Sequence, residues 1–102
     1  MSKTVFLNID LKDGQHQGVQ VDDQHLLVAR INGEYYVTSN ICSHARVLLS
    51  KGKLRGTTII CPLHGARFDI TSGQCLGGPT QQPITRYRAQ VETSGIMVTL
   101  PD

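Results

Sequence analysis

The sequence predicts an all-β fold built from short antiparallel strands, and three observations lead to this prediction. Short runs rich in β-branched residues recur along the chain, and several of them alternate apolar with polar residues. Asn32-Gly33, a dipeptide typical of two-residue hairpin turns, separates two of these runs. No segment of useful length repeats apolar residues at helical spacing. We therefore expect strands joined by tight turns and no substantial helix.

The first half of the chain contains one expected strand and one expected hairpin. Thr4–Ile9 alternates apolar and polar residues and is predicted to be a strand. The polar residues 10–17, which include a glycine, are expected to form a loop. Leu26–Ile31 and Glu34–Thr38 flank the Asn32-Gly33 turn, so we expect them to pair with each other.

The second half is expected to supply the remaining strands. Residues 45–50 are too few for a helix to be predicted with them. A turn at Thr71-Ser72-Gly73 and a hairpin connection at Glu92–Gly95 are expected between strands. Gly77-Gly78-Pro79 has the composition of an ordinary bend. The expected strands are Thr57–Ile60, Ala66–Ile70, Ile84–Val91 and Ile96–Leu100.

Length and composition indicate a small cytoplasmic domain. A chain of 102 residues is expected to form one domain, residues 1–102. No signal peptide is expected, and no run approaches the roughly 18 apolar residues of a membrane span. The net charge of +2 is too small to indicate nucleic acid or a membrane surface as partner. The odd count of three cysteines argues for reduced thiols, and Cys75 is interpreted as a small, partly buried apolar residue.

The charged residues are distributed unevenly along the chain. Residues 1–41 contain three bases and five acids, whereas residues 42–68 contain five bases and no acid. Two interpretations are open for the basic segment. It can be an ordinary solvated surface, or it can be a docking face for an acidic partner.

Two short segments carry the residues with metal-binding chemistry. They are Cys42-Ser43-His44 and Cys61-Pro62-Leu63-His64, and 16 residues separate them. Two thiolates and two imidazoles form a four-ligand set that suits either a tetrahedral zinc ion or an iron–sulfur cluster. The candidate ligands are Cys42, His44, Cys61 and His64, expected at the tips of two β-hairpins.

The pairing of ligand types favours the cluster over zinc. Structural zinc sites commonly keep two cysteines together and two histidines together. Here each segment supplies one of each, so both thiolates can bind one metal while both imidazoles bind another. A two-iron cluster with two histidines on one iron has this division of ligands. A zinc-binding interaction module is the alternative, and it would be colourless.

These segments, with the residues after them, resemble a known family. The residues Cys42-Ser43-His44, Cys61-Pro62-Leu63-His64-Gly65, Phe68-Asp69 and Thr71-Ser72-Gly73 are similar to the signature of the Rieske [2Fe–2S] proteins. The resemblance is strongest to the Rieske-type ferredoxins of bacterial ring-hydroxylating oxygenase systems. It implies stacked antiparallel sheets with a cluster-binding part at about residues 40–80 and a loop at Gly77–Pro79 covering the cluster. It also implies that Cys42 and Cys61 bind the inner iron of one [2Fe–2S] cluster, and His44 and His64 the outer iron.

The resemblance implies an electron carrier and not an enzyme. Electrons would pass from a flavin-containing NAD(P)H-dependent ferredoxin reductase to a terminal Rieske oxygenase of aromatic hydrocarbon breakdown. The carrier is expected to be a monomer. Outside the ligand set, His16 and His25 are the remaining histidines, which leaves no set for a mononuclear iron site. The alternative is a Rieske-type small subunit held in a larger reductase or oxidase complex, as in nitrite reduction.

Four neighbours of the expected ligands depart from the high-potential Rieske proteins. Those proteins have a disulfide between the two ligand loops, and the matching residues here are Val47 and Leu63. They also place serine and tyrosine hydroxyls against the cluster, and the matching residues here are Ala66 and Phe68. Hydrogen bonds to the cluster sulfurs stabilise the reduced form, so their loss predicts a low redox potential.

Overall fold

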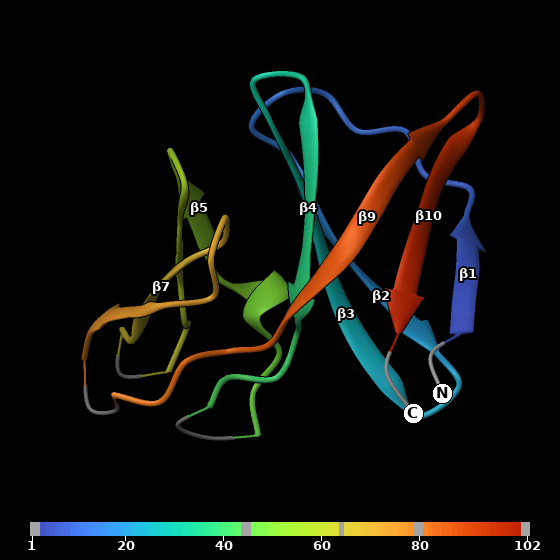
Figure 1. Ribbon diagram of the computed structural model, residues 1–102. Coiled ribbons are helices and arrows are strands. Elements are labelled where there is room, and N and C mark those ends of the chain that lie inside the picture. The colour runs from blue at the N-terminus through green and yellow to red at the C-terminus, as the bar shows by residue number, and fades with distance from the viewer. Residues whose placement is uncertain (1–2, 44–45, 64, 79–80, 101–102) are drawn as a thin grey trace.

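The computed structural model describes residues 3–43, 46–63, 65–78 and 81–100 (Figure 1). Within these ranges the chain forms ten strands and one short 3-10 helix, so the all-β prediction is confirmed. The described part contains no helix long and apolar enough to cross a membrane. The elements are β1 (Lys3–Leu7), β2 (His16–Val21), β3 (Gln24–Ile31), β4 (Glu34–Ser39), η1 (Leu49–Lys51), β5 (Lys53–Arg55), β6 (Thr58–Ile60), β7 (Arg67–Asp69), β8 (Cys75–Gly77), β9 (Arg86–Glu92) and β10 (Gly95–Leu100).

The strands form two antiparallel sheets that lie side by side. The larger sheet has six strands in the order β1-β10-β9-β4-β3-β2, and the smaller has four in the order β5-β6-β7-β8. Figure 1 shows the four-stranded sheet on the left, next to β4 and β3 of the larger sheet. The smaller sheet is made from consecutive hairpins, so its loops turn back at short intervals. One of these turns carries the second segment of expected ligands.

Strand β3 separates two hydrophobic cores. Its residues 26–29 are fully buried, with 0% exposure, although successive side chains of a strand point to opposite faces. Leu26 and Val28 pack into the core of the large sheet. Leu27 and Ala29 pack into a second core, together with residues of the small sheet. A strand buried on both faces explains the uninterrupted apolar run that the sequence shows here.

The second core includes two of the three cysteines. Cys42 and Cys61 are 3% and 2% exposed and lie among buried apolar side chains of both sheets. Each segment of expected ligands is therefore anchored in the packed interior by its cysteine. The buried members of this core are Leu27, Ala29, Cys42, Leu49, Ile59, Cys61, Ala66, Phe68, Ile70 and Ile84.

The hairpin expected around Asn32-Gly33 is confirmed. Asn32 and Gly33 have φ angles of 52° and 82°, as a type I′ turn requires at both central positions. Strands β3 and β4 pair in register on either side, from Ile31 opposite Glu34 to Leu26 opposite Ser39. The second predicted hairpin is also present, with Glu92 of β9 opposite Gly95 of β10.

Strand β2 is a correction to the sequence prediction, because its first residues were expected in a loop. The segment HQGVQV has few apolar residues and a glycine at its centre, and both weaken a strand signal. That glycine is required by packing. A Cβ at Gly18 would lie 2.7 Å from the Asn40 amide nitrogen and 2.7 Å from the Ser50 hydroxyl oxygen. The segment is a strand because its backbone pairs with β3 along its whole length.

Smaller differences concern strand β8 and several boundaries. The three residues of β8 were not predicted as a strand, since they are a short glycine-flanked segment. Strand β1 is Lys3–Leu7 where Thr4–Ile9 was expected, and β9 begins at Arg86 where Ile84 was expected. Residue Ile84 is instead buried in the core between the sheets, where its N–H donates to the Gly73 carbonyl oxygen at 2.9 Å.

Asp69 holds the turn that follows β7. Its Oδ1 accepts hydrogen bonds from the Thr71 N–H at 2.9 Å and from the Thr71 hydroxyl at 2.7 Å. Its carbonyl oxygen accepts from the Gly73 N–H at 2.6 Å. The sequence pattern after Phe68 thus has a structural explanation, because the aspartate and threonine side chains build the turn and the glycine closes it.

Substituting Gly73 with alanine is expected to destabilise the protein by about 2–4 kcal/mol. Gly73 has φ +83°, and a Cβ there would overlap the carbonyl oxygen of Ile84, which is backbone and cannot turn away. Gly14→Ala is the matched control, because Gly14 has φ +87° with nothing within 4 Å of an added Cβ. We expect it to cost about 1 kcal/mol, from backbone strain alone. Thermal unfolding followed by circular dichroism measures both, and equal losses would contradict the role of the Ile84 carbonyl.

Candidate metal centre

The two segments of expected ligands form loops that are closed in the same way. The Cys42 N–H donates to the Val47 carbonyl oxygen at 3.0 Å, and the Cys61 N–H donates to the Ala66 carbonyl oxygen at 2.7 Å. In each case the acceptor lies five residues after the cysteine. We call these the first loop, residues 42–47, and the second loop, residues 61–66. The expected ligands His44 and His64 fall within these loops and lie outside the described residues.

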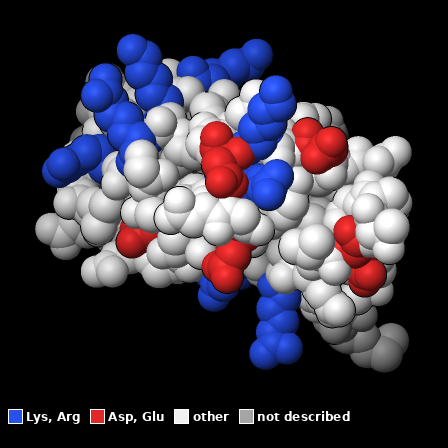
Figure 2. All heavy atoms as spheres, turned by 90° about the horizontal axis from the view of Figure 1, so that it is seen from above, with Lys and Arg blue, Asp and Glu red and all other residues white. Residues whose placement is uncertain are grey.

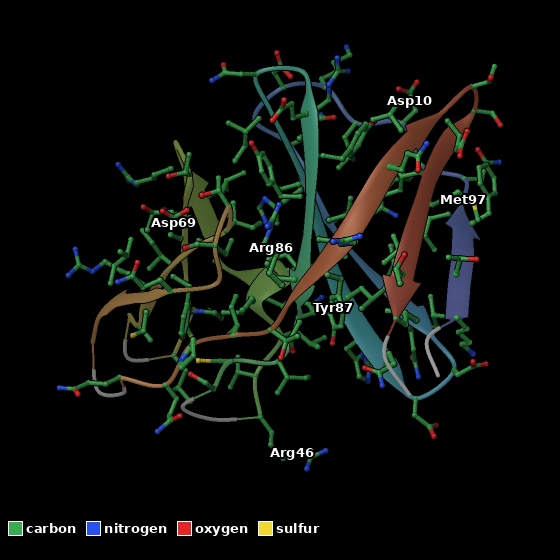
Figure 3. All side chains as sticks on the ribbon, in the orientation of Figure 1. Asp10, Arg46, Asp69, Arg86, Tyr87 and Met97 are labelled. Carbon is green, nitrogen blue, oxygen red and sulfur yellow. The ribbon has the colours of Figure 1, made fainter. Side chains whose placement is uncertain are left out.

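The elements that carry the two loops differ. The second loop joins β6 directly to β7, so it is a hairpin tip as predicted. The first loop follows β4 after two residues and is closed by a single antiparallel bridge between Ile41 and Leu48. It then enters η1 and not a partner strand, so the predicted hairpin tip is correct for one loop of the two. Figure 3 shows the Arg46 side chain extending from the first loop away from the two sheets.

Asn40 ties together the two ends of the first loop. Its side-chain oxygen accepts from the Ser50 N–H at 2.7 Å, and its amide nitrogen donates to the Ser50 hydroxyl at 3.0 Å. Its carbonyl oxygen accepts from the Leu49 N–H at 2.7 Å, and its own N–H donates to the His25 carbonyl oxygen at 2.8 Å. Asn40 is 2% exposed, so these bonds are shielded from water. Sequence reasoning missed this residue, because one asparagine before the first cysteine carries no local signal of its partner ten residues later.

The thiols of Cys42 and Cys61 meet in the interior. The Cys42 side chain lies close enough to the Cys61 thiol to affect its pKa, so the structure brings together the two predicted sulfur ligands. Burial raises the pKa of the Cys61 thiol, while a hydrogen bond from the Leu63 N–H acts in the opposite direction. Without a metal, therefore, the interior favours the neutral form of the Cys61 thiol. A bound iron ion would reverse this preference, because a coordinating thiol is deprotonated.

This arrangement fits the inner half of a two-iron cluster. Two soft sulfur ligands adjoin each other, each at the start of a short loop, and one of them has a backbone N–H aimed at it. Within the described ranges no group of three or more histidine, cysteine, aspartate or glutamate side chains could hold a metal ion. The complete ligand set therefore depends on His44 and His64, whose assignment stays a prediction.

A third segment packs against both loops. A Cβ at Gly78 would come within 2.6 Å of the Ala66 Cα, so Gly78 lies directly on the second loop. The Ser43 hydroxyl of the first loop donates to the Gln82 carbonyl oxygen at 2.7 Å. The bend expected at Gly77–Pro79 thus starts where the chain crosses the second loop, while Pro79 lies outside the described residues. A glycine is needed here because any side chain would push the two backbones apart.

The side chains around the thiols are mainly apolar. Ala66 and Phe68 are fully buried, and Val47 packs against the same core. Leu63 is 40% exposed, at the tip of the second loop. Cys75 packs against the core between the sheets, in agreement with its interpretation as a partly buried apolar residue.

The fold and this site define a class of protein: an all-β scaffold in which two matched loops each begin with a buried cysteine, a donor pair that suits an iron–sulfur centre. Comparison with known proteins then gives the family. The model of the Rieske [2Fe-2S] domain matches residues 2–88. The chain belongs to this family, whose cofactor is a [2Fe–2S] cluster.

Relatives with known roles are similar over most of the chain. The ferredoxin component of the naphthalene 1,2-dioxygenase system of Pseudomonas putida is 37% identical over 91 residues, which is 89% of this chain and 88% of the relative. The 3-phenylpropionate/cinnamic acid dioxygenase ferredoxin subunit of Shigella boydii is 33% identical over 95 residues, covering 91% of this chain and 88% of the relative. These relatives are ferredoxin components of dioxygenase systems.

Solved structures show the same architecture. The Sphingomonas yanoikuyae B1 ferredoxin superposes with a TM-score of 0.82 at 36% identity, covering 88% of this chain and 89% of that one. A chain from the complex of reduced oxygenase and oxidised ferredoxin in carbazole 1,9a-dioxygenase superposes with a TM-score of 0.84 at 29% identity, covering 94% and 99%. The predicted Rieske-type fold is confirmed.

Proposed function

We propose that this protein is a one-electron carrier between a flavin-containing NAD(P)H-dependent reductase and a terminal ring-hydroxylating oxygenase. The observation that carries the proposal is the buried pair Cys42 and Cys61, placed at the start of two identically closed loops. The ferredoxin components of the naphthalene and phenylpropionate systems support the role, since they are similar over about nine tenths of the chain. The carbazole complex supports the oxygenase as the acceptor.

Different residues of the chain would bind the two irons of the cofactor. Cys42 and Cys61 would ligate the inner iron from the packed core, and His44 and His64 would ligate the outer iron. A bound Rieske cluster supplies one-electron chemistry, and its surroundings set the potential and the access of partners. Asn40 orients the first loop through its bonds to Ser50. Packed, hydrogen-bonded loops of this kind keep a metal centre in one geometry.

Other features of the proposal concern the state of the protein. We infer that residues 1–102 form a single domain and that the protein acts as a monomer in the cytoplasm. The odd count of three cysteines argues for reduced thiols and supports a cytoplasmic location. Support for an independent carrier over a fixed subunit of a larger complex comes from the relatives, which are ferredoxin components of a length similar to this chain.

Reconstitution with purified partners tests the proposed function. The protein should be red-brown as isolated and should make oxygenase turnover dependent on its addition to the reductase and NAD(P)H. The naphthalene and phenylpropionate systems are the first partners to try, because their ferredoxin components are relatives. A colourless protein containing zinc would refute the carrier and support an interaction module. A red-brown protein that co-purifies with a large reductase and never dissociates would support the fixed subunit.

The redox potential is expected near the lower end of the Rieske span of about −150 to +300 mV. The reason is that Ala66, the last residue of the second loop, and Phe68, two residues later, are fully buried and have no hydroxyl to donate to a cluster sulfur. Phe68→Tyr should raise the midpoint potential by tens of millivolts, because a hydrogen bond of about 1–1.5 kcal/mol then stabilises the reduced form. A spectroscopic redox titration measures this.

Phe6→Tyr is the matched control for the potential. Phe6 lies in β1 of the large sheet and is 44% exposed, so the same hydroxyl is added far from the ligand loops. Its midpoint potential should equal that of the unmodified protein. A midpoint above roughly +150 mV in the unmodified protein would contradict the argument from the missing hydroxyls.

A further inference from the structure

The outer face of the four-stranded sheet carries two rows of side chains. Antiparallel pairing places Lys53, Ile60 and Arg67 side by side, and it places Arg55, Thr58 and Asp69 in a second row. The row between them points inward, with Ile59 and Phe68 fully buried in the core between the sheets. Because side chains alternate along a strand, the two flanking rows face outward. We call this surface the cationic face, since Lys53, Arg55 and Arg67 are all exposed.

The balance of basic and acidic residues differs between residues 40–80 and the rest of the chain. Residues 40–80 contain five bases and one acid, whereas the rest of the chain contains five bases and seven acids. Figure 2 shows a group of lysine and arginine side chains at the upper left, over the four-stranded sheet, and further basic side chains beside carboxylates near the centre. The molecule is therefore polarised, with its positive end on the sheet that carries the second loop.

Among the described residues, no base of the cationic face forms a side-chain ion pair. The described residues contain two side-chain ion pairs, Lys3 with Asp22 and Arg30 with Asp13. All four of these residues lie outside residues 40–80. Asp69, the one acid of residues 40–80, stands in the second row and binds Thr71 through its Oδ1, so Lys53, Arg55 and Arg67 outnumber the acid on this face. The face therefore keeps its positive potential available to a partner.

The cationic face adjoins the proposed cluster site. Ile60, the middle residue of the first row, is followed directly by Cys61, and Arg67 directly follows the Ala66 that closes the second loop. The Arg67 guanidinium occupies the space over Gly77 that a Cβ there would fill, next to the Gly78 segment that covers Ala66. Lys53 and Arg67 thus flank the base of the second loop. A partner that binds these two side chains would lie beside the loop that carries the predicted ligands Cys61 and His64.

We propose that the cationic face is the docking surface for the acidic surface of the terminal oxygenase. This inference rests on the proposed function, in which the oxygenase–ferredoxin complex of carbazole 1,9a-dioxygenase supports the oxygenase as the partner. It adds the chemistry of that partner. Opposite charge steers two proteins into contact and raises the association rate, and salt screens the effect. Exposed bases flanking Ile60 give the charged rim and the partly apolar centre that a transient interface requires. The partner of this chain is thus recognised by carboxylates placed beside its electron-accepting centre.

Charge reversal at the base of the second loop tests the proposal. Lys53→Glu with Arg67→Glu should lower the second-order rate of electron transfer to the oxygenase about tenfold or more at low ionic strength. The matched control is Lys12→Glu with Arg88→Glu, which changes the net charge equally at exposed residues outside the four-stranded sheet. Stopped-flow oxidation of the pre-reduced protein by the oxygenase measures the rate. The visible spectrum of each variant checks that the cluster is intact.

The outcomes separate the docking face from the carrier role. The proposal is supported if the Lys53/Arg67 variant is slow, the control is fast and the difference disappears at high salt. Equal losses in both variants would show an effect of net charge, and unchanged rates would show a plain solvated surface, so either overturns the proposal. Slower reduction by the reductase with unchanged oxidation by the oxygenase overturns the choice of partner. Failure of the unmodified protein to reduce the oxygenase refutes the proposed function itself.

Discussion

Replacing Cys42 or Cys61 with serine is expected to abolish binding of the [2Fe–2S] cluster. Both cysteines are buried and their side chains lie close together, so neither can be replaced by a ligand from solvent. A serine oxygen is a poor ligand for iron in this setting, because the cluster is held by thiolates and the interior disfavours a charged alkoxide. The red-brown absorption should be missing, and iron and sulfide analysis of the purified variants should fall to background.

Cys75→Ser is the matched control for this prediction. Cys75 lies in β8 of the four-stranded sheet, yet it is only partly buried, and its sulfur lies 3.7 Å from the Gly77 carbonyl oxygen as a weak donor. We expect this variant to keep a full cluster. Cluster loss in Cys75→Ser, or a normal cluster in either Cys42→Ser or Cys61→Ser, would contradict the ligand assignment.

Replacing His64 with alanine is expected to reduce electron delivery to the oxygenase to background. The imidazole would ligate the outer iron, so its removal changes both the stability of the cluster and its potential. The protein should still fold, because the second loop remains closed by the bond from Cys61 to Ala66. Low-temperature electron paramagnetic resonance of the reduced protein should show loss of the Rieske signal, and circular dichroism should show retention of the strands.

His25→Ala is the control for His64→Ala. His25 lies in β3 of the large sheet, and its carbonyl oxygen, which the substitution keeps, is the group that binds the Asn40 N–H. Its signal and its turnover should match those of the unmodified protein. Unchanged oxygenase turnover with His64→Ala would remove this histidine from the ligand set.

The parts of the fold that the sequence predicted are those determined locally. The Asn32-Gly33 turn needs two residues with positive φ, and its residue types meet this need without help from the rest of the chain. Strand β2 could not be predicted in this way, because its strand state comes from pairing with β3. Gly18, which weakens the local signal, is explained only by Asn40 and Ser50 in space.

The candidate site shows the same contrast between features determined by the local sequence and features that depend on contacts in space. The spacing of the two cysteines and two histidines is a local pattern and was sufficient to predict a cluster. The role of Asn40 depends on Ser50 being folded back beside it, and the contact of Gly78 with Ala66 depends on two hairpins meeting. The basic segment was visible in the sequence, but its arrangement in outward rows required the register of β5, β6 and β7.

The shared strand β3 has a consequence for how the molecule comes apart. Its four central residues belong to two cores at once, so neither sheet can be detached without exposing apolar surface of the other. The two sheets are therefore expected to form one cooperative folding unit, and a fragment limited to residues 40–80 would lack one wall of its interior. Cofactor binding at the loops would then stabilise the whole folding unit, including strands that have no contact with the iron.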